Sequence, residues 1–316
     1  MRTEPMASAG DRPTTIPARK LASGTQPDVA YTIATLVTDP AQYDLMRRSF
    51  AAGGFDADDC EYLFIDNTGK EQASAYAGLN RALSEARGRY VILCHQDVRL
   101  IESGDARNDL DSRLAELHSH DPDWALAGNA GGSAPGQLAL RISDPHGSNR
   151  HVGELPARVT SLDENFIVVR REANLGFSHD LSGFHFYGTD ICLNADILGW
   201  HAYVIDFHIW HLSSGNKQTR SFATGKEDIR AKWSKALRPR WIQTTCALLR
   251  LDGEPLRQLV GHLLEEPVQK LSRRMPGARG WTVSPSTAGK SSEPGNAGST
   301  DPSPSSRSKP GNDEAA

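Results

Sequence analysis

The chain has 316 residues, of which 38% are hydrophobic and 23% charged, and its formal net charge is -4. This composition is typical of a soluble globular protein, and the length suits one large α/β domain or two smaller ones. The slightly negative charge excludes a general attraction to nucleic acid. Four cysteines lie far apart without zinc-type spacing, so reduced thiols in a cytoplasmic protein are expected.

Two terminal stretches, residues 1–28 and 276–316, are poor in large apolar residues and are predicted to be disordered. The first lacks the apolar segment of a secretory signal, and no run of about 18 apolar residues could span a bilayer. Residues 289–291 resemble the end of a phosphate loop. Position 284 holds Ser284 instead of glycine and no strand precedes it, so we reject that motif.

An apolar run at residues 90–94 stops abruptly at His95, Gln96 and Asp97. A strand without polar alternation is typical of a parallel sheet covered on both faces, and such sheets carry their chemistry beyond the carboxyl ends of their strands. A carboxylate there could hold a divalent cation or a sugar hydroxyl. Taken alone, the three residues are better explained as a strand that ends in a polar turn.

Strands and helices alternate before this run. We expect strands at 31–37 and 62–65 and helices at 41–52 and 72–86. Such a unit is right-handed and doubly wound, so its strand ends meet at one edge of the sheet. The strand-end residues expected there are Val37, Thr38, Asp66, Asn67, His95, Gln96 and Asp97.

This order lacks the glycine fingerprint of dinucleotide enzymes and resembles the donor half of GT-A-fold glycosyltransferases, particularly family 2. The resemblance covers about residues 31–215 and implies a doubly wound mixed α/β sheet flanked by helices. It implies that Asp66 meets the nucleotide base, that Asn80 lies beside the donor pocket, and that Asp97 holds Mn²⁺ or Mg²⁺ on the diphosphate. His95 replaces an aspartate of the family motif. Because imidazole suits softer metals, we expect it to bind the ribose or sugar, or to orient Asp97.

The middle of the chain is less regular. We expect a short helix at 109–118, a strand at 124–127, a glycine-rich loop at 128–136 and an antiparallel excursion from 138.

An acidic pair, Asp163 and Glu164, leads into the apolar strand that follows. It marks either a solvated strand start or, as the resemblance implies, a sugar or acceptor pocket, where His185 is also placed.

A helix is expected to begin at Thr189, as its N-cap, and to end at Gly199. Asp190 would then stabilise the helix dipole, which is sufficient to explain a carboxylate there. The resemblance implies a second role, in which Asp190 removes the acceptor proton and Thr189 replaces the first acid of the family's pair. A base at a helix N-terminus stays ionised but is weak.

The next strand ends near two histidines, His208 and His211, which alternation places on opposite faces. The resemblance implies that His211 contacts the metal or diphosphate, whereas His208 is expected to be a core histidine. Residues 226–251 and 256–271 are predicted helices. The basic residues of the first helix form a solvated face, with contact to anionic lipid or to the diphosphate as alternatives.

The sequence therefore predicts an inverting, metal-dependent hexosyltransferase that moves a sugar from a nucleoside diphosphate to a carbohydrate or other hydroxyl acceptor. Carbohydrate or cell-envelope polysaccharide biosynthesis, in the cytoplasm or at the membrane's inner face, would suit it. Two alternatives remain open: a silent GT-A-fold scaffold, and a metal hydrolase using His95, Asp97, His208 and His211. The predicted divisions are a tail (1–28), a GT-A domain (29–225), a helical extension (226–275) and a second tail (276–316).

Overall fold

The computed structural model describes residues 29–56, 59–101, 105–213, 219–236, 238–243 and 248–274. The two tails predicted to be disordered lie outside the described residues. The chain forms two compact units, which separate after Arg238.

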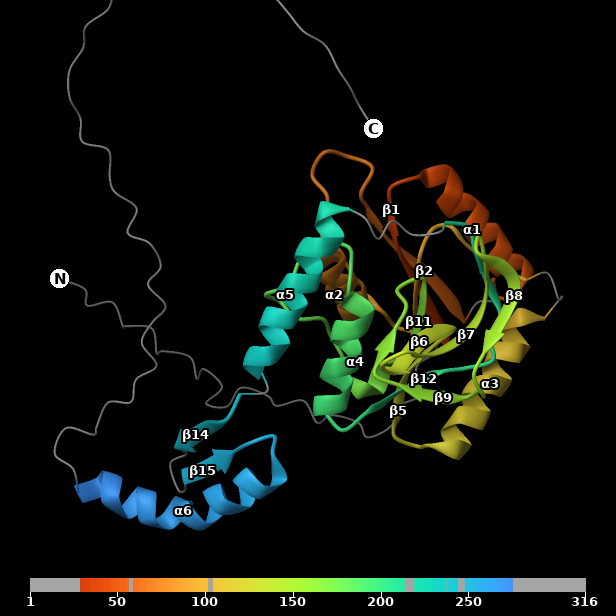
Figure 1. Cartoon of the computed structure of the whole chain (residues 1–316). Coiled ribbons are helices and arrows are strands. Elements are labelled where there is room, and N and C mark those ends of the chain that lie inside the picture. Colours follow the sequence, from red (N-terminus) through yellow and green to blue (C-terminus); the bar gives the residue numbers. More distant parts are fainter. Residues whose placement is uncertain are drawn as a thin grey trace, which may run out of the picture. The chain divides into compact units, whose positions relative to one another are not determined.

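A seven-stranded mixed sheet forms the centre of the larger unit (Figure 1). In spatial order its strands are β2 (Cys60–Asp66), β1 (Tyr31–Val37), β3 (Tyr90–Cys94), β11 (Phe166–Arg170), β5 (Trp124–Gly128), β12 (His201–Val204) and β9 (Ala157–Val159). β1 is parallel to β2 and β3, whereas β11 runs antiparallel to both β3 and β5. The predicted doubly wound unit is therefore confirmed, and the antiparallel β11 makes the sheet mixed.

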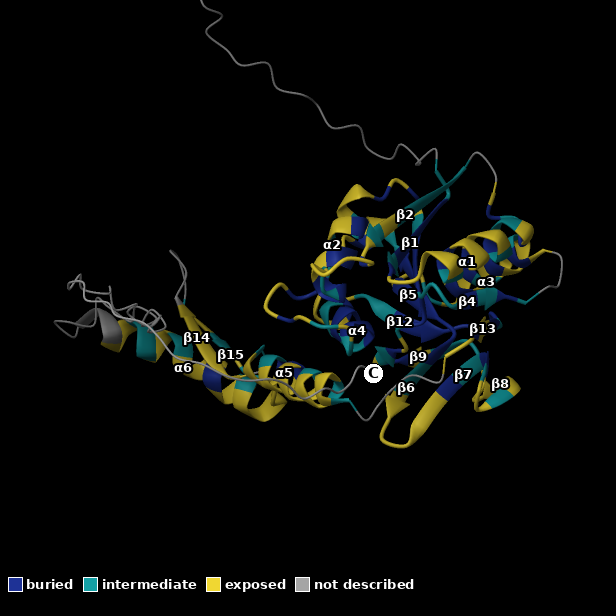
Figure 2. Ribbon diagram, turned by 90° about the horizontal axis from the view of Figure 1, so that it is seen from above, coloured by how far each residue is buried: buried dark blue, intermediate teal, exposed yellow. Residues whose placement is uncertain are grey.

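Five helices cover the two faces of this sheet. α1 (Pro40–Ala52) and α3 (Ala106–His120) pack on one face, and α2 (Ala75–Glu85), α4 (Tyr187–Ile197) and α5 (Arg220–Ala236) pack on the other. Successive strand residues point to opposite faces, so Ile33 and Ala34 of β1 join different cores. The buried residues form the centre of the unit in Figure 2. A short 3₁₀ helix spans Arg171–Ala173.

A second, smaller sheet carries part of the candidate site. Its order is β10 (Ser161–Leu162), β6 (Ala130–Ala134), β7 (Gln137–Asp144), β13 (Ile209–His211) and β4 (Val98–Leu100), with β8 (Gly147–Val152) paired to β7. The β7–β8 hairpin confirms the expected antiparallel excursion. The prediction of a loop at 128–136 is wrong, because residues 130–134 form a strand. Gly131 allows it: a Cβ there would lie 2.4 Å from the carbonyl oxygen of Ser161 in the paired strand.

The smaller unit contains a hairpin, β14 (Arg240–Gln243) and β15 (Leu248–Leu251), and the helix α6 (Pro255–Arg274). The predicted helix over residues 226–251 is therefore wrong beyond Ala236. Pro239 disfavours helical backbone at the residue before it and cannot donate a helical hydrogen bond itself.

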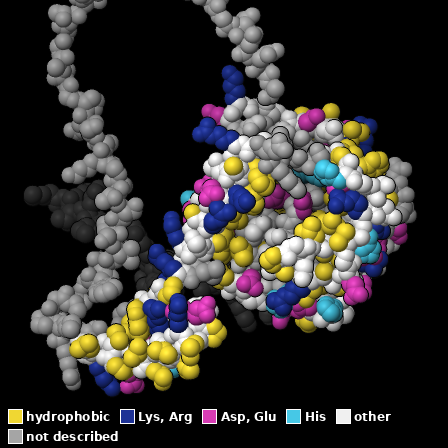
Figure 3. Space-filling model, viewed as in Figure 1, with side chains coloured by type: hydrophobic (Ala, Val, Ile, Leu, Met, Phe, Trp, Pro, Cys, Tyr) yellow, Lys and Arg dark blue, Asp and Glu magenta, His cyan; other side chains and the backbone are white. Residues whose placement is uncertain are grey.

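Helix α6 rests on the hairpin through polar contacts. Gln258 donates to the carbonyl oxygen of Arg250 over 2.6 Å, and Glu265 accepts from the backbone N–H of the same residue over 2.8 Å. Its apolar side chains point outward, and Leu256 and Leu263 are 73% and 68% exposed; Figure 3 shows hydrophobic side chains gathered on this unit. Among the described helices, none is both long and apolar enough to span a membrane.

Candidate functional site

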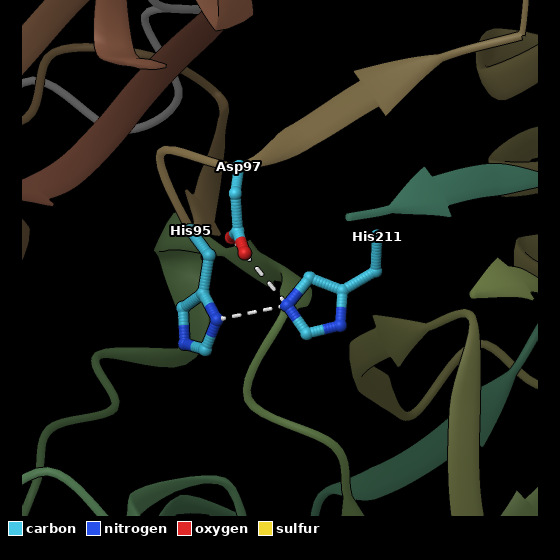
Figure 4. A group of neighbouring side chains, drawn as sticks. All are labelled: His95, Asp97 and His211. Atoms are coloured by element: carbon cyan, nitrogen blue, oxygen red, sulfur yellow. Dashed lines mark hydrogen bonds and ion pairs between the residues drawn. The ribbon is translucent and has the colours of Figure 1, made fainter. Parts of the chain in front are cut away.

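Three side chains converge where the two sheets meet. His95 and Asp97 lie in the turn between β3 and β4, and β13 pairs with β4 so that His211 stands opposite Val98. Figure 4 shows the three side chains pointing toward one another. The Nε2 atom of His211 lies 3.4 Å from Nδ1 of His95 and 3.4 Å from Oδ1 of Asp97. The structure thus brings Asp97 and His211 together, although 114 residues separate them in the sequence (211 − 97).

The charges in this cluster support one another. Burial alone would raise the pKa of Asp97, but the hydrogen bond and charge of His211 outweigh it and hold this pKa well below its usual range. Burial would lower the pKa of His211, but the hydrogen bond and charge of Asp97 raise it above its usual value. Burial, followed by the charge of His211, lowers the pKa of His95. The cluster therefore combines an ionised carboxylate with a histidine that is neutral at physiological pH.

The residues fit a divalent first-row metal. One ligand atom from each of His95, Asp97 and His211 lies within 4.8 Å of the others. Two imidazoles and one carboxylate suit Mn²⁺ and softer ions better than Mg²⁺, which prefers oxygen ligands. His95, expected to orient Asp97 or to bind sugar, directs its own Nδ1 into this cluster.

Two neighbours of the cluster were not predicted. The hydroxyl of Ser213 lies 3.2 Å from Nε2 of His211, and that of Tyr187 lies 2.9 Å from Nε2 of His95. Ser213 could have been suspected as a polar residue just beyond the last histidine of the strand. Tyr187 lies 92 residues from His95 and is 3% exposed, so in the sequence it looks like any core aromatic residue.

The donor-side residues have different surroundings. Gln96 accepts the backbone N–H groups of Thr38 and Asp39 over 2.9 Å each and thereby ties the end of β1 to the end of β3. Asp66 is exposed, and hydrogen bonds from the backbone N–H and then the hydroxyl of Thr68 lower its pKa.

Three other residues predicted to bind the sugar donor are buried or hydrogen-bonded within the protein itself. Val37 is buried, Asn67 exchanges hydrogen bonds with the backbone of Ala73, and Asn80 does the same with Phe177. Their contact with a nucleotide stays a prediction.

The acidic pair lies beside the metal-type cluster. Asp163 is exposed, and its charge acts on both His95 and His211. Glu164 accepts backbone N–H groups of residues 186–188 at the start of α4. Burial, followed by the charge of Asp163, raises the pKa of Glu164 to about 8. His185 lies at 3.5 Å from the hydroxyl of Ser221, and burial lowers its pKa.

Asp190 lies in the first turn of α4, but as its fourth residue and not its first. α4 begins at Tyr187 with Phe186 as its N-cap, so the prediction that Thr189 caps it is wrong; the carboxyl group of Glu164 accepts the first backbone N–H groups of the helix. Asp190 is 0% exposed and accepts from the backbone and hydroxyl of Ser178 over 2.7 Å each. Nε1 of Trp233 donates to it over 3.0 Å, and Nδ2 of Asn194 over 3.3 Å. The role of Asp190 in proton removal stays a prediction.

His208 lies outside the cluster. Its Nε2 is 3.0 Å from the hydroxyl of Ser143, and within the described ranges the only metal-type group comprises His95, Asp97 and His211. The four-residue set of the hydrolase alternative is therefore not assembled.

Strands β2, β1 and β3 are parallel, β11 is antiparallel, and a small second sheet completes the Asp-His cluster, which is the mixed α/β arrangement expected of a GT-A-type fold. No protein-family model matches the chain. Over 188 residues the chain is 42% identical to the Fuscovulum blasticum protein called "ATP synthase subunits region ORF 6". The aligned residues make up 57% of this chain and 74% of that protein. The chain belongs to the same family as that protein.

Solved structures that resemble the chain include two complexes with nucleotide sugars. S. aureus TarS 1-349 with UDP-GlcNAc has 12% identity and a TM-score of 0.46, covering 66% of this chain and 67% of that one. The mannosyltransferase PcManGT from Pyrobaculum calidifontis, with GDP-Man and Mn²⁺, has 14% identity and a TM-score of 0.43, covering 77% and 72%. With TM-scores below 0.5, these likenesses assign neither a substrate nor a mechanism to this chain.

Proposed function

We propose that the chain is a metal-dependent glycosyltransferase that moves a sugar from a nucleoside diphosphate to a hydroxyl acceptor. The observation that supports this most is the convergence of His95, Asp97 and His211 at the carboxyl edge of the parallel strands of a GT-A-type sheet. A divalent cation held there would neutralise the charge of the diphosphate. Mn²⁺ suits these ligands better than Mg²⁺.

The other residues receive roles that fit their positions. Asp66, exposed at the end of β2, is proposed to meet the base, and Asp163, exposed beside both histidines, to meet the sugar or the acceptor. Asp190 acts as the proton acceptor only if the donors from Ser178 and Trp233 release it. Hexosyl transfer with inversion at the anomeric carbon, as in family 2, is part of this proposal.

Calorimetry with a panel of nucleoside diphosphates, with and without Mn²⁺, tests the proposal. We expect one of them to bind only when Mn²⁺ is present, and Asp97→Asn to abolish that binding. His208→Gln is the matched control, since this histidine bonds Ser143 and lies outside the cluster. Wild-type protein that binds no nucleoside diphosphate with Mn²⁺ would contradict the proposal.

The scaffold alternative predicts the same nucleotide-sugar binding as the transferase and differs from it only in lacking turnover. If a nucleotide sugar binds with Mn²⁺ but is neither transferred nor hydrolysed, the chain is a binding protein. The burial and the hydrogen bonds of Asp190 are the reason to test for it. Zinc retained by the purified protein, without any nucleotide affinity, would instead favour a hydrolase.

Peripheral membrane contact is proposed for the smaller unit. The outward Leu256, Leu259 and Leu263 of α6 support it, because exposed apolar helix faces enter lipid interfaces. The basic residues of α5 lie in the larger unit, where Lys232 pairs with Asp180, and do not bear on this contact. Co-sedimentation with anionic vesicles should be lost in Leu259→Glu, and sedimentation equal to that of the wild-type protein would contradict the contact.

A further inference from the structure

A chain of hydrogen bonds leads from the candidate metal site into the protein. Nε2 of His95 lies 2.9 Å from the hydroxyl oxygen of Tyr187, and that hydroxyl lies 3.0 Å from the backbone carbonyl oxygen of Glu164. On the other side of the imidazole ring, Nδ1 of His95 lies 3.4 Å from Nε2 of His211.

These contacts determine which nitrogen of His95 carries the proton. A carbonyl oxygen can only accept, so the single hydroxyl proton of Tyr187 must point at Glu164. The hydroxyl oxygen is then left with lone pairs, and its contact with Nε2 is favourable only when Nε2 donates. A neutral imidazole carries one N–H, so Nδ1 keeps its lone pair and directs it into the cluster.

Tyr187 is held firmly in the position that this requires. Its ring is 3% exposed and packs edge-on against Tyr76 and Phe177. Glu164 contacts it twice, because its carbonyl accepts the hydroxyl while its carboxylate accepts the backbone N–H of the same tyrosine. The acceptor and the ring therefore cannot shift independently.

We propose that Tyr187 is a positioning residue that holds His95 as the Nε2–H tautomer and so makes Nδ1 available as a metal ligand. The role of Tyr187 rests on the proposed function only in taking a divalent metal as the group that Nδ1 binds. Without the hydroxyl, Nε2–H loses its acceptor, and the tautomer that carries its proton on Nδ1 is no longer disfavoured. That proton occupies the place of the metal, and partners of this kind are typically worth 10- to 100-fold in affinity.

Mn²⁺ affinity, followed by the electron paramagnetic resonance of the free ion, tests the proposal. We expect Tyr187→Phe to bind Mn²⁺ roughly 10- to 100-fold more weakly than wild type. The matched control is Tyr76→Phe, which removes a buried hydroxyl from the same aromatic group, where it donates to the carbonyl of His185 over 2.9 Å; it should bind Mn²⁺ as wild type does. Equal affinity in Tyr187→Phe and wild type would overturn the proposal, as would an equal loss in both variants.

Nitrogen-15 NMR of the metal-free wild-type protein gives a second readout, which needs no variant to fold. We expect the His95 ring to show a protonated Nε2 and a bare Nδ1; a protonated Nδ1 would overturn the proposal. This result is independent of metal binding. Wild-type protein that binds no Mn²⁺ would contradict the proposed function, while the tautomer would still decide the role of Tyr187.

Discussion

Replacing Asp190 by asparagine separates a structural carboxylate from a catalytic one. Each oxygen of this buried group takes two donors: Oδ1 accepts from the hydroxyl of Ser178 and from Trp233, and Oδ2 from the backbone of Ser178 and from Asn194. An amide group is nearly the same size, but its nitrogen donates. The serine hydroxyl can turn to accept from it, whereas the indole N–H of Trp233 cannot.

The expected loss of unfolding free energy follows from the number of donors to Asp190. At least one buried donor is left without an acceptor, which costs about 1–3 kcal/mol, and the remaining bonds lose the benefit of a charged acceptor. We expect Asp190→Asn to lower the free energy of unfolding by about 2–4 kcal/mol. At roughly 2–4 °C per kcal/mol for a domain of this size, Tm should fall by about 5–15 °C.

Urea unfolding of the wild type, Asp190→Asn, Trp233→Phe and the double variant forms a cycle that isolates the contact between the two side chains. Because Trp233→Phe removes the indole N–H that would be orphaned, the double variant should be less destabilised than the sum of the single ones. If Asp190→Asn unfolds within about 0.5 kcal/mol of wild type and yet loses transfer, the structural reasoning is refuted. Asp190 would then be the proton acceptor that the family resemblance implies.

Three further predictions follow from particular contacts. Glu164 holds its proton more tightly in the folded chain, so its own contribution to stability should be full below about pH 4.5 and fall by a few kcal/mol, about 1.4 per pKa unit, as the pH rises to about 8. Glu164→Gln should flatten this part of the stability profile in thermal melts, and an unchanged slope would contradict it. Gly131→Ala should lower the unfolding free energy by about 1–3 kcal/mol, because its Cβ would meet the Ser161 carbonyl, while Gly69→Ala, with open space around it, should not. Calorimetry should show tighter binding of Mn²⁺ than of Mg²⁺, and the reverse order would argue against imidazole ligands.

Local signals in the sequence were sufficient to predict the strands and helices of the parallel half of the sheet. Pro40 after Asp39 marks the start of α1, and the carboxylate of Asp39 does cap it by accepting from Ala41 and Gln42. The apolar run that stops at His95 indicates both a buried strand and the edge at which polar residues gather. The grouping of Asp97 with His211 came from the family resemblance, because β13 lies in the smaller sheet and no local pattern connects it to β3.

What the sequence could not show depends on contacts distant along the chain. Trp233, 43 residues later, helps to bury Asp190, and α4 starts early because the carboxyl group of Glu164 accepts its first N–H groups. A glycine-rich stretch reads as a loop unless the strand that approaches Gly131 is known. Such contacts override local propensity, and the helix predicted over 226–251 failed for a simpler reason, the proline at position 239.

Anomalous X-ray diffraction from crystals grown with Mn²⁺ and a nucleoside diphosphate is the most direct test of the metal site. We predict one manganese peak bound by Nδ1 of His95, Nε2 of His211 and a carboxylate oxygen of Asp97, with the diphosphate on the same ion. A nucleotide bound without manganese at these three residues, or manganese bound elsewhere on the chain, would contradict the account.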